Sequence, residues 1–195
     1  HHRFLLRLHL EQIEMLEKAI AQLEGRTDEL IAPFRERVEL LTTMPGVSRT
    51  LARVMVAEIG LDMSRFKTVG HLVSWAGLCP RLDESAGKRR STKVRNGAPW
   101  LKATLVQSAW AAVSKKDSYL RARFLRIKAR RGPKKAIVAV AASMLRAAYY
   151  MLRDNQPYRE LGSHHFDQVD RGKAVRRLTR RIEALGFVVE LRPAA

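Results

Sequence analysis

Apolar residues recur every seven positions along the first part of the chain, and this pattern predicts a long helical arm. Two lines of apolar side chains run three residues apart: Leu6, Ile13, Ile20, Phe34 and Leu41 form one, and Leu16, Leu23 and Leu30 form the other. We expect helix over residues 4–42, with a bend or break at both Gly25 and Pro33. Two structures fit the pattern: a coiled-coil arm that packs on another copy or domain, and an ordinary helical hairpin with a buried seam.

Residues 41–59 join the end of one helix to the start of another through a Pro-Gly-Val turn. Ser48 is the expected N-cap of the second helix, and Arg49 follows it. A glycine such as Gly46 lets the backbone approach a phosphate, and free amides at a helix start attract anions. The segment therefore predicts a helix-hairpin-helix element that contacts the DNA backbone. A plain αα-hairpin turn that uses the same residues for packing is the alternative.

The rest of the chain is again mostly helical by its periodicity. Helices are expected at residues 68–76, 98–114, 117–130, 134–153 and 171–185. The helix at 98–114 is apolar almost all round, which predicts a central, buried position. Residues 187–191 read as one short strand, or as an arm that docks on a partner.

The expected fold class is therefore mainly α: a long N-terminal helix or coiled-coil arm, then a helical domain with a helix-hairpin-helix element, and at most a few short strands. We divide the chain into an arm (1–42), a helical domain (43–160) and a C-terminal basic helix with a short strand (161–195).

Charge adds a partner to this picture. The formal net charge is +18, which indicates a polyanion and most often a nucleic acid. Between residues 85 and 153 there are eighteen Lys or Arg residues and a single acid, Asp117. The single cysteine, Cys79, allows no internal disulfide and favours a reducing compartment. No run of apolar residues reaches the ~18 positions that a bilayer-spanning helix needs, so no membrane partner is expected.

The stretch 83–97 carries the candidate chemistry. Ser85 stands in a polar, glycine-containing loop and is followed by five cations: Lys88, Arg89, Arg90, Lys93 and Arg95. Phosphoryl transfer to a serine hydroxyl needs an accessible nucleophile and fixed cations around the developing charge. On composition alone, however, a serine before Ala-Gly is more often a plain loop residue.

Metal chemistry finds less support in the chain itself. Its acids cluster in the N-terminal arm, where they look like solvated helix faces. His164, His165 and Asp167 have loose ligand spacing but are better explained as surface-loop residues. We expect no metal site and no cofactor in this chain.

The residues expected to contact nucleic acid share a position at a helix start, in the Ser85 loop or on a basic helix face. They are Gly46, Ser48, Arg49, Lys88, Arg89, Arg90, Lys93, Arg95, Lys102, Arg121, Arg126, Lys128, Arg130, Arg131, Lys134 and Lys135.

Several short motifs resemble one known family. They are Trp75-Ala76-Gly77-Leu78-Cys79-Pro80, Glu84-Ser85-Ala86-Gly87-Lys88, Arg95-Asn96-Gly97 and Trp100-Leu101. Together they resemble the C-terminal transposase domain of the bridge-RNA-guided recombinases of bacterial insertion sequences (the insertion sequence 110/116/902 family). The resemblance covers roughly residues 1–192.

That resemblance implies a two-domain enzyme. In such enzymes a resolvase-like N-terminal domain binds Mg²⁺ through acidic residues, and a serine of the C-terminal domain attacks a DNA phosphodiester to form a phosphoserine. The matching serine here is Ser85. Ser91 stands where the family typically has glycine, and it is a second candidate nucleophile.

We expect the acidic N-terminal domain, and with it Mg²⁺, to be absent from this sequence. The chain should then bind nucleic acid without completing recombination alone. The implied partners are double-stranded DNA, a structured guide RNA and further copies of the chain, as a dimer or tetramer through the arm. The implied location is the bacterial cytoplasm, at the nucleoid. The alternatives are a non-catalytic helix-hairpin-helix module that binds nucleic acid, and a structural role for the arm.

Overall fold

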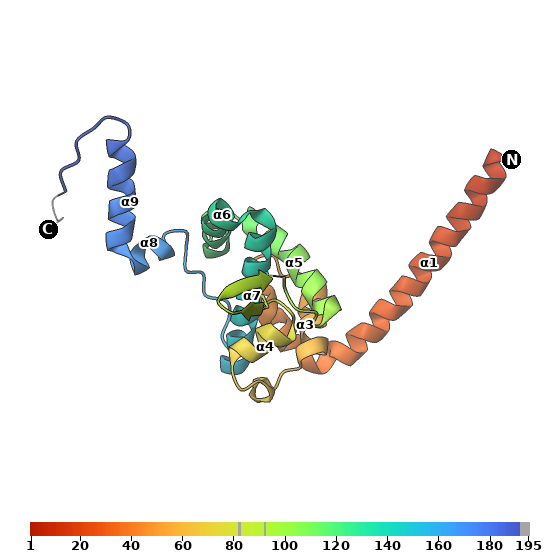
Figure 1. Ribbon diagram of the computed structural model, residues 1–195. Helices are drawn as coiled ribbons and strands as arrows, with labels where there is room; N and C mark the ends of the chain where they lie inside the picture. Colours follow the sequence, from red (N-terminus) through yellow and green to blue (C-terminus); the bar gives the residue numbers. More distant parts are fainter. Residues whose placement is uncertain (82, 92, 192–195) are drawn as a thin grey trace.

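A computed structural model describes residues 1–81, 83–91 and 93–191, with the backbone alone at Asp83, Arg89 and Arg90. It shows a helical body with a long helix projecting from one side and a helical tail on the other (Figure 1). The elements in chain order are α1 His2–Ile31, η1 Ala32–Phe34, α2 Arg35–Thr42, α3 Arg49–Ile59, η2 Met63–Arg65, α4 Val69–Trp75, β1 Asp83–Ser85, β2 Lys88–Ser91, α5 Pro99–Ser114, α6 Tyr119–Arg131, α7 Pro133–Asp154, α8 His165–Val169 and α9 Arg171–Glu183. The expected mainly-α fold class is confirmed.

The arm is a single straight helix up to the first proline. α1 passes through Gly25 without a break, so the expected bend there is wrong; a lone glycine weakens a helix by only about 1 kcal/mol. Pro33 does interrupt the helix and stands in the short 3₁₀ turn η1. No residue of the fully described α1 is buried, and Leu23 and Leu30 are 68% and 60% exposed. A helical hairpin with a buried seam is therefore wrong for this arm.

An ion pair joins the base of the arm to the body. Arg53 of α3 pairs with Asp28 of α1. A second polar contact lies close to this base, where Arg37 of α2 donates to the side-chain oxygen of Asn155 just after α7. The first contact holds the last turns of α1 against α3, and the second holds α2 against the end of α7.

The core is organised around α7, which packs against α2, α4, α5 and α6. Ten of its residues are buried, among them Val140, Met144 and Leu145. In the described part of the chain, α7 is also the one helix long and apolar enough to cross a membrane by length and composition. Its burial at the centre of four other helices accounts for that composition.

The expectation that the helix at 98–114 is buried all round is wrong. α5 buries one face through Leu101, Leu105 and Ala109, whereas Trp100 and Trp110 are 76% and 47% exposed. Trp110 lies edge-on against Phe124 of α6, with ring centroids 5.6 Å apart. An exposed tryptophan counts as apolar in the sequence, so periodicity could not distinguish the two faces.

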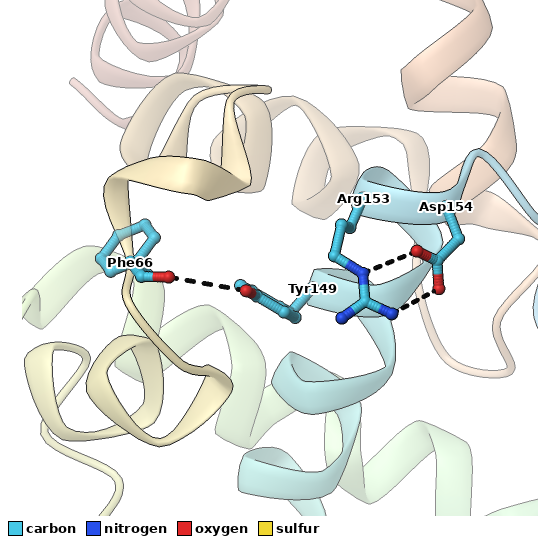
Figure 2. A network of polar contacts seen from close by, with 4 residues as sticks. All are labelled: Phe66, Tyr149, Arg153 and Asp154. Carbon is cyan, nitrogen blue, oxygen red and sulfur yellow. Dashed lines mark hydrogen bonds and ion pairs between the residues drawn. The ribbon is translucent and has the colours of Figure 1, made fainter.

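Polar side chains near the C-terminal end of α7 form hydrogen bonds (Figure 2). The Tyr149 hydroxyl donates to the Phe66 carbonyl oxygen at 3.5 Å. Arg153 donates two hydrogen bonds to Asp154, at 2.6 and 2.9 Å. These hydrogen bonds lower the pKa of the Asp154 carboxyl.

After α7 an extended segment leaves the body and leads to the two helices of the tail, α8 and α9. The basic helix is confirmed as α9, whereas α8 was not expected from the sequence. Phe166 of α8 stacks on Tyr119 with ring centroids 5.2 Å apart, and Arg126 of α6 lies 5.0 Å from the centre of the Phe166 ring.

The expected strand at 187–191 is wrong, because this segment is irregular and has no neighbouring strand among the described residues with which to pair. Residues 192–195, the end of the third expected domain, lie outside the described residues. The domain boundaries at 42/43 and 160/161 stay predictions.

Candidate nucleic-acid interface

The Ser85 stretch is a β-hairpin rather than a flexible loop. β1 and β2 pair antiparallel with Ser85 opposite Lys88, and within the described residues they are the only strands. Ala86 and Gly87 form the turn, with φ of 51° and 73°. Positive φ at both central residues is the geometry that suits a two-residue hairpin, because its twist matches that of the strands. The hairpin therefore presents Ser85 at its tip.

Two glycines hold the base of this hairpin. A Cβ on Gly97 would lie 2.3 Å from the Gly77 nitrogen and 2.5 Å from the Trp75 carbonyl oxygen. A Cβ on Gly77 would lie 2.7 Å from the Arg95 carbonyl oxygen. Backbone therefore packs directly on backbone where the chain leaves α4 and where it returns to α5. Sequence patterns indicated no packing role for Gly97, although a glycine in each of two separate motifs was the available signal.

Further pairing stiffens the segment between the glycines and the tip. Pro80 and Val94 form an isolated antiparallel bridge, and the Arg81 N–H donates to the Lys93 carbonyl oxygen at 2.9 Å. The Lys102 ammonium of α5 donates to the Arg95 carbonyl oxygen at 3.1 Å. The position of the tip is thus set by backbone contacts on both sides.

Ser85 and Ser91 differ in availability. Ser85 is exposed, and its hydroxyl makes no hydrogen bond with the described residues. The Ser91 hydroxyl accepts a hydrogen bond from the Lys93 N–H at 3.2 Å, and the residue is half-buried. Directly opposite residues of an antiparallel pair project to the same face, so Ser85 and Lys88 share one face of the hairpin.

The structure divides the expected cations into two groups. Arg121 is half-buried and donates to the Val113 carbonyl oxygen at 3.2 Å. Lys128 lies 5.8 Å from the centre of the Phe124 ring, and Arg126 contacts Phe166. These three, and Lys102 with its bond to the Arg95 carbonyl oxygen, have partners inside the molecule. The exposed residues without such contacts in the described part of the chain are Arg49, Lys88, Lys93, Arg95, Arg130, Arg131, Lys134 and Lys135. The side chains of Arg89 and Arg90 lie outside the described residues.

None of the expected cations whose side chains are described forms an ion pair with another described residue. The ion pairs among the described residues involve Arg26, Arg53, Arg153 and Arg177, none of which is an expected contact. Lys134 and Lys135 lie in the first turn of α7, which holds no acid. Cations at a helix N-terminus add to the positive end of the helix dipole, so this arrangement concentrates positive potential.

The turn between α2 and α3 has a packing role. The Ser48 hydroxyl accepts a hydrogen bond from the Leu51 N–H at 3.2 Å, so the expected cap is confirmed. Gly46 has φ of 81°, and a Cβ there would lie 2.7 Å from both the Ala112 nitrogen and the Ser108 carbonyl oxygen. Close approach to α5 therefore explains this glycine. Contact of the turn with DNA stays a prediction.

Groups that bind metals are dispersed. Within the described residues, no three His, Cys, Asp or Glu side chains gather where they could hold an ion. His165 packs against the rings of Tyr119 and Phe166, and Asp167 pairs with Arg177 at 3.0 Å.

Comparison with known proteins places this hairpin inside a region that resembles a transposase family. Residues 38–125 match the model of the Transposase IS116/IS110/IS902 family. The chain is 32% identical over 153 residues to the pilin gene-inverting protein of Moraxella bovis, covering 76% of this chain and 45% of that protein. It is 28% identical over 161 residues to a probable family 20 transposase of Pseudomonas aeruginosa, covering 80% and 46%. An uncharacterized protein of the insertion element IS110 from Streptomyces coelicolor is 32% identical over 121 residues, covering 61% and 29%. The chain thus spans less than half the length of these relatives.

Proposed function

We propose that this chain, whose residues 38–125 match the model of the IS116/IS110/IS902 transposase family, acts as a transposase that binds DNA and supplies Ser85 as the nucleophile for strand cleavage and exchange. The observation that carries the proposal is the exposed hydroxyl of Ser85, unbonded among the described residues, at the tip of a hairpin whose base packs backbone against backbone, and on the same face as Lys88. The names of the relatives support a recombination function, since one inverts a pilin gene and another is a probable transposase.

The proposed step is a phosphoryl transfer. The Ser85 oxygen attacks the phosphorus of a DNA phosphodiester, and an O–P bond to serine forms. The P–O bond to the departing deoxyribose oxygen breaks; the serine proton passes to a base, and the departing oxygen takes up a proton. Lys88 and its neighbouring cations stabilise the negative charge that develops on the phosphate oxygens. Rejoining is the reverse transfer. A hydroxyl of a different DNA strand attacks the phosphorus, and the O–P bond to Ser85 breaks.

The resemblance assigns Mg²⁺ to acidic residues of a resolvase-like domain. The described residues do not fit such a site, because their acids and histidines do not gather. No step is therefore routed through a metal in this chain, and Mg²⁺ binding by another domain stays part of the proposal.

DNA binding is proposed for the exposed cations around the hairpin, the end of α6 and the start of α7. Further copies are proposed to associate through the exposed apolar seam of α1. A structured guide RNA is proposed as a second nucleic-acid partner, on the family resemblance. Such a protein would act on DNA in the bacterial cytoplasm.

The direct test is the Ser85→Ala substitution in the whole protein that carries this chain. The affinity for DNA should change by less than about twofold, because a serine hydroxyl supplies little of the electrostatic attraction. The covalent protein–DNA adduct, and strand exchange with it, should be abolished. Both can be followed by denaturing electrophoresis of labelled DNA in the presence of Mg²⁺.

The Ser91→Ala variant is the matched control and should still form the adduct. An adduct formed by the Ser85→Ala variant would rule out Ser85 as the nucleophile. So would loss of the adduct in the Ser91→Ala variant alone, which would assign the role to Ser91. If the unmodified protein forms no adduct under any condition, the chain is a non-catalytic nucleic-acid-binding module.

A further inference from the structure

A pocket of about 400 Å³ lies between α6, α7 and the extended segment 156–161. Its volume falls in the range of pockets that hold small ligands, roughly 300–1,000 Å³. Aromatic and cationic side chains converge on it from three separate segments, which is why sequence patterns did not indicate it. They are Tyr119, Arg123, Arg146, Tyr150, Tyr158 and Arg159.

The pocket carries uncompensated positive charge. Within the described residues, none of Arg123, Arg146 and Arg159 has a carboxylate partner. The Nε of Arg123 is buried and lacks a hydrogen-bond partner among those residues, while one of its Nη atoms donates to the Tyr119 hydroxyl at 3.4 Å. A guanidinium carries five N–H donors, so Arg123 keeps donors beside the one bonded to Tyr119 that an acceptor in the pocket can use.

The one acid that lines the pocket, among the described residues, does not cancel this charge. Asp154 is held by Arg153 through two hydrogen bonds, at 2.6 and 2.9 Å (Figure 2). The pair is neutral as a unit. Glu160 stands beside the pocket, where its carboxylate accepts hydrogen bonds from the Tyr119 N–H at 2.8 Å and the Gly162 N–H at 3.0 Å. An anionic group entering the pocket therefore meets three arginines against this one carboxylate, so the balance of charge remains positive.

Tyr150 and Tyr158 supply flat apolar surface and free hydroxyls. The Arg153 guanidinium lies 4.7 Å from the centre of the Tyr150 ring, so one face of that ring is already covered. Tyr150 is 44% exposed, and Tyr158 is half-buried. Neither hydroxyl forms a hydrogen bond with the described residues. Burial raises the pKa of the Tyr158 phenol, so the hydroxyl stays neutral and able to donate. Aromatic rings beside guanidinium groups are the combination on which proteins stack unpaired bases.

We propose that this pocket binds one unpaired nucleotide of a nucleic-acid strand, with the base against the tyrosines and the phosphate against the arginines. The inference rests on the proposed nucleic-acid binding and adds a preference for unpaired bases to it. A base inside a duplex keeps both faces in the stack, whereas an unpaired or flipped base can enter a pocket. Contacts of the lysines and arginines at the hairpin and the start of α7 with phosphates carry no information about base pairing, so this surface does not supply such a preference.

The test compares two duplexes that are identical except for one unpaired nucleotide, prepared as DNA and as RNA. The chain should bind the duplex with the unpaired nucleotide about tenfold more tightly, as expected for one stacked base. Fluorescence anisotropy gives the two dissociation constants. Comparison of the DNA and RNA pairs shows which strand supplies the nucleotide.

Two double variants separate pocket chemistry from folding. Arg146→Ala with Tyr150→Ala should abolish the preference, and both side chains are exposed, so helix α7 should keep its circular dichroism signal. Arg146→Lys with Tyr150→Phe keeps a cation and a ring, and should retain most of the preference. Arg35→Ala, an exposed arginine outside the pocket, should change nothing.

Equal affinities of the unmodified chain for both duplexes would overturn this inference alone. So would an unchanged preference in the Arg146→Ala, Tyr150→Ala variant. Failure of the unmodified chain to bind any duplex would overturn the proposed function as well. Substituting Lys134 and Lys135 by alanine should weaken binding to both duplexes equally and leave their ratio intact.

Discussion

At the scale of single residues, Gly77 and Gly97 decide where the Ser85 hairpin stands. Each glycine occupies a place where any side chain would collide with backbone atoms of the segment around the other glycine. Backbone has little freedom to yield, unlike the end of a flexible side chain. The nucleophile that we propose is therefore positioned by two residues that have no side chain and take no part in the chemistry.

Replacing Gly97 by alanine should destabilise the body. The added Cβ would lie 2.3 Å from the Gly77 nitrogen, and overpacking of this kind costs roughly 1–3 kcal/mol. Urea unfolding followed by circular dichroism measures the change in the free energy of unfolding. Gly25→Ala is the control: nothing lies within 4 Å of that Cβ, so the body should keep its stability. An unchanged midpoint for Gly97→Ala would contradict the close packing.

At the scale of elements, the arm and α5 both expose large apolar side chains to solvent. Leu16, Leu23 and Leu30 are each more than half exposed along one line of α1. An apolar line at heptad spacing is what a partner helix buries in a coiled coil. This supports the proposed association of the arm with a second copy, whereas the polar face of α1 has no such requirement.

A charge placed on that line should separate the copies. Leu23→Lys should shift sedimentation toward the monomer, because a lysine in the seam would be buried without a partner. The thermal unfolding of the body should stay the same, since Leu23 makes no contribution to the core. Gln22→Lys adds the same charge beside the line and should leave the mass unchanged. A monomeric unmodified chain would refute association through the arm.

At the scale of the whole molecule, positive charges stand where they lower the stability of a helix, at the N-terminal end of α7. The body carries the excess of a chain whose net charge is +18, and α7 begins with Lys134 and Lys135 beside its own positive dipole end. Such cations lower helix stability by about 0.3–1 kcal/mol each. Their position is readily explained if a phosphate backbone covers them.

Removing both lysines should therefore act in opposite directions on stability and on binding. The Lys134→Ala, Lys135→Ala variant should unfold at a slightly higher temperature but bind duplex DNA more weakly. The slope of log affinity against log salt concentration should fall by about two, because each lysine neutralises one phosphate in the complex. Titrations between roughly 50 and 200 mM salt measure this slope. A slope equal to that of the unmodified chain would show that these lysines do not contact phosphate.

Local rules account for what was correctly predicted from the residues. The Ser48 cap, the break at Pro33, and the helices that became α6, α7 and α9 depend on neighbours a few positions away. The same rules misjudged α5 and residues 187–191. Apolar content does not say which tryptophan is covered, and β-propensity does not supply a strand to pair with.

The sequence by itself determined the helical class, the basic character of the chain and the motifs around Ser85, because composition and short-range periodicity carry that information. Only the tertiary structure decided that the Ser85 stretch is a hairpin, that Gly46 serves the approach to α5, and that Gly77 meets Gly97. It also brought Arg123, Arg146 and Tyr158 to one pocket. The glycine contacts and the pocket join residues far apart in the chain, and packing alone sets such distances. The hairpin pairs near neighbours, but its polar strands carry no apolar alternation that would have indicated it.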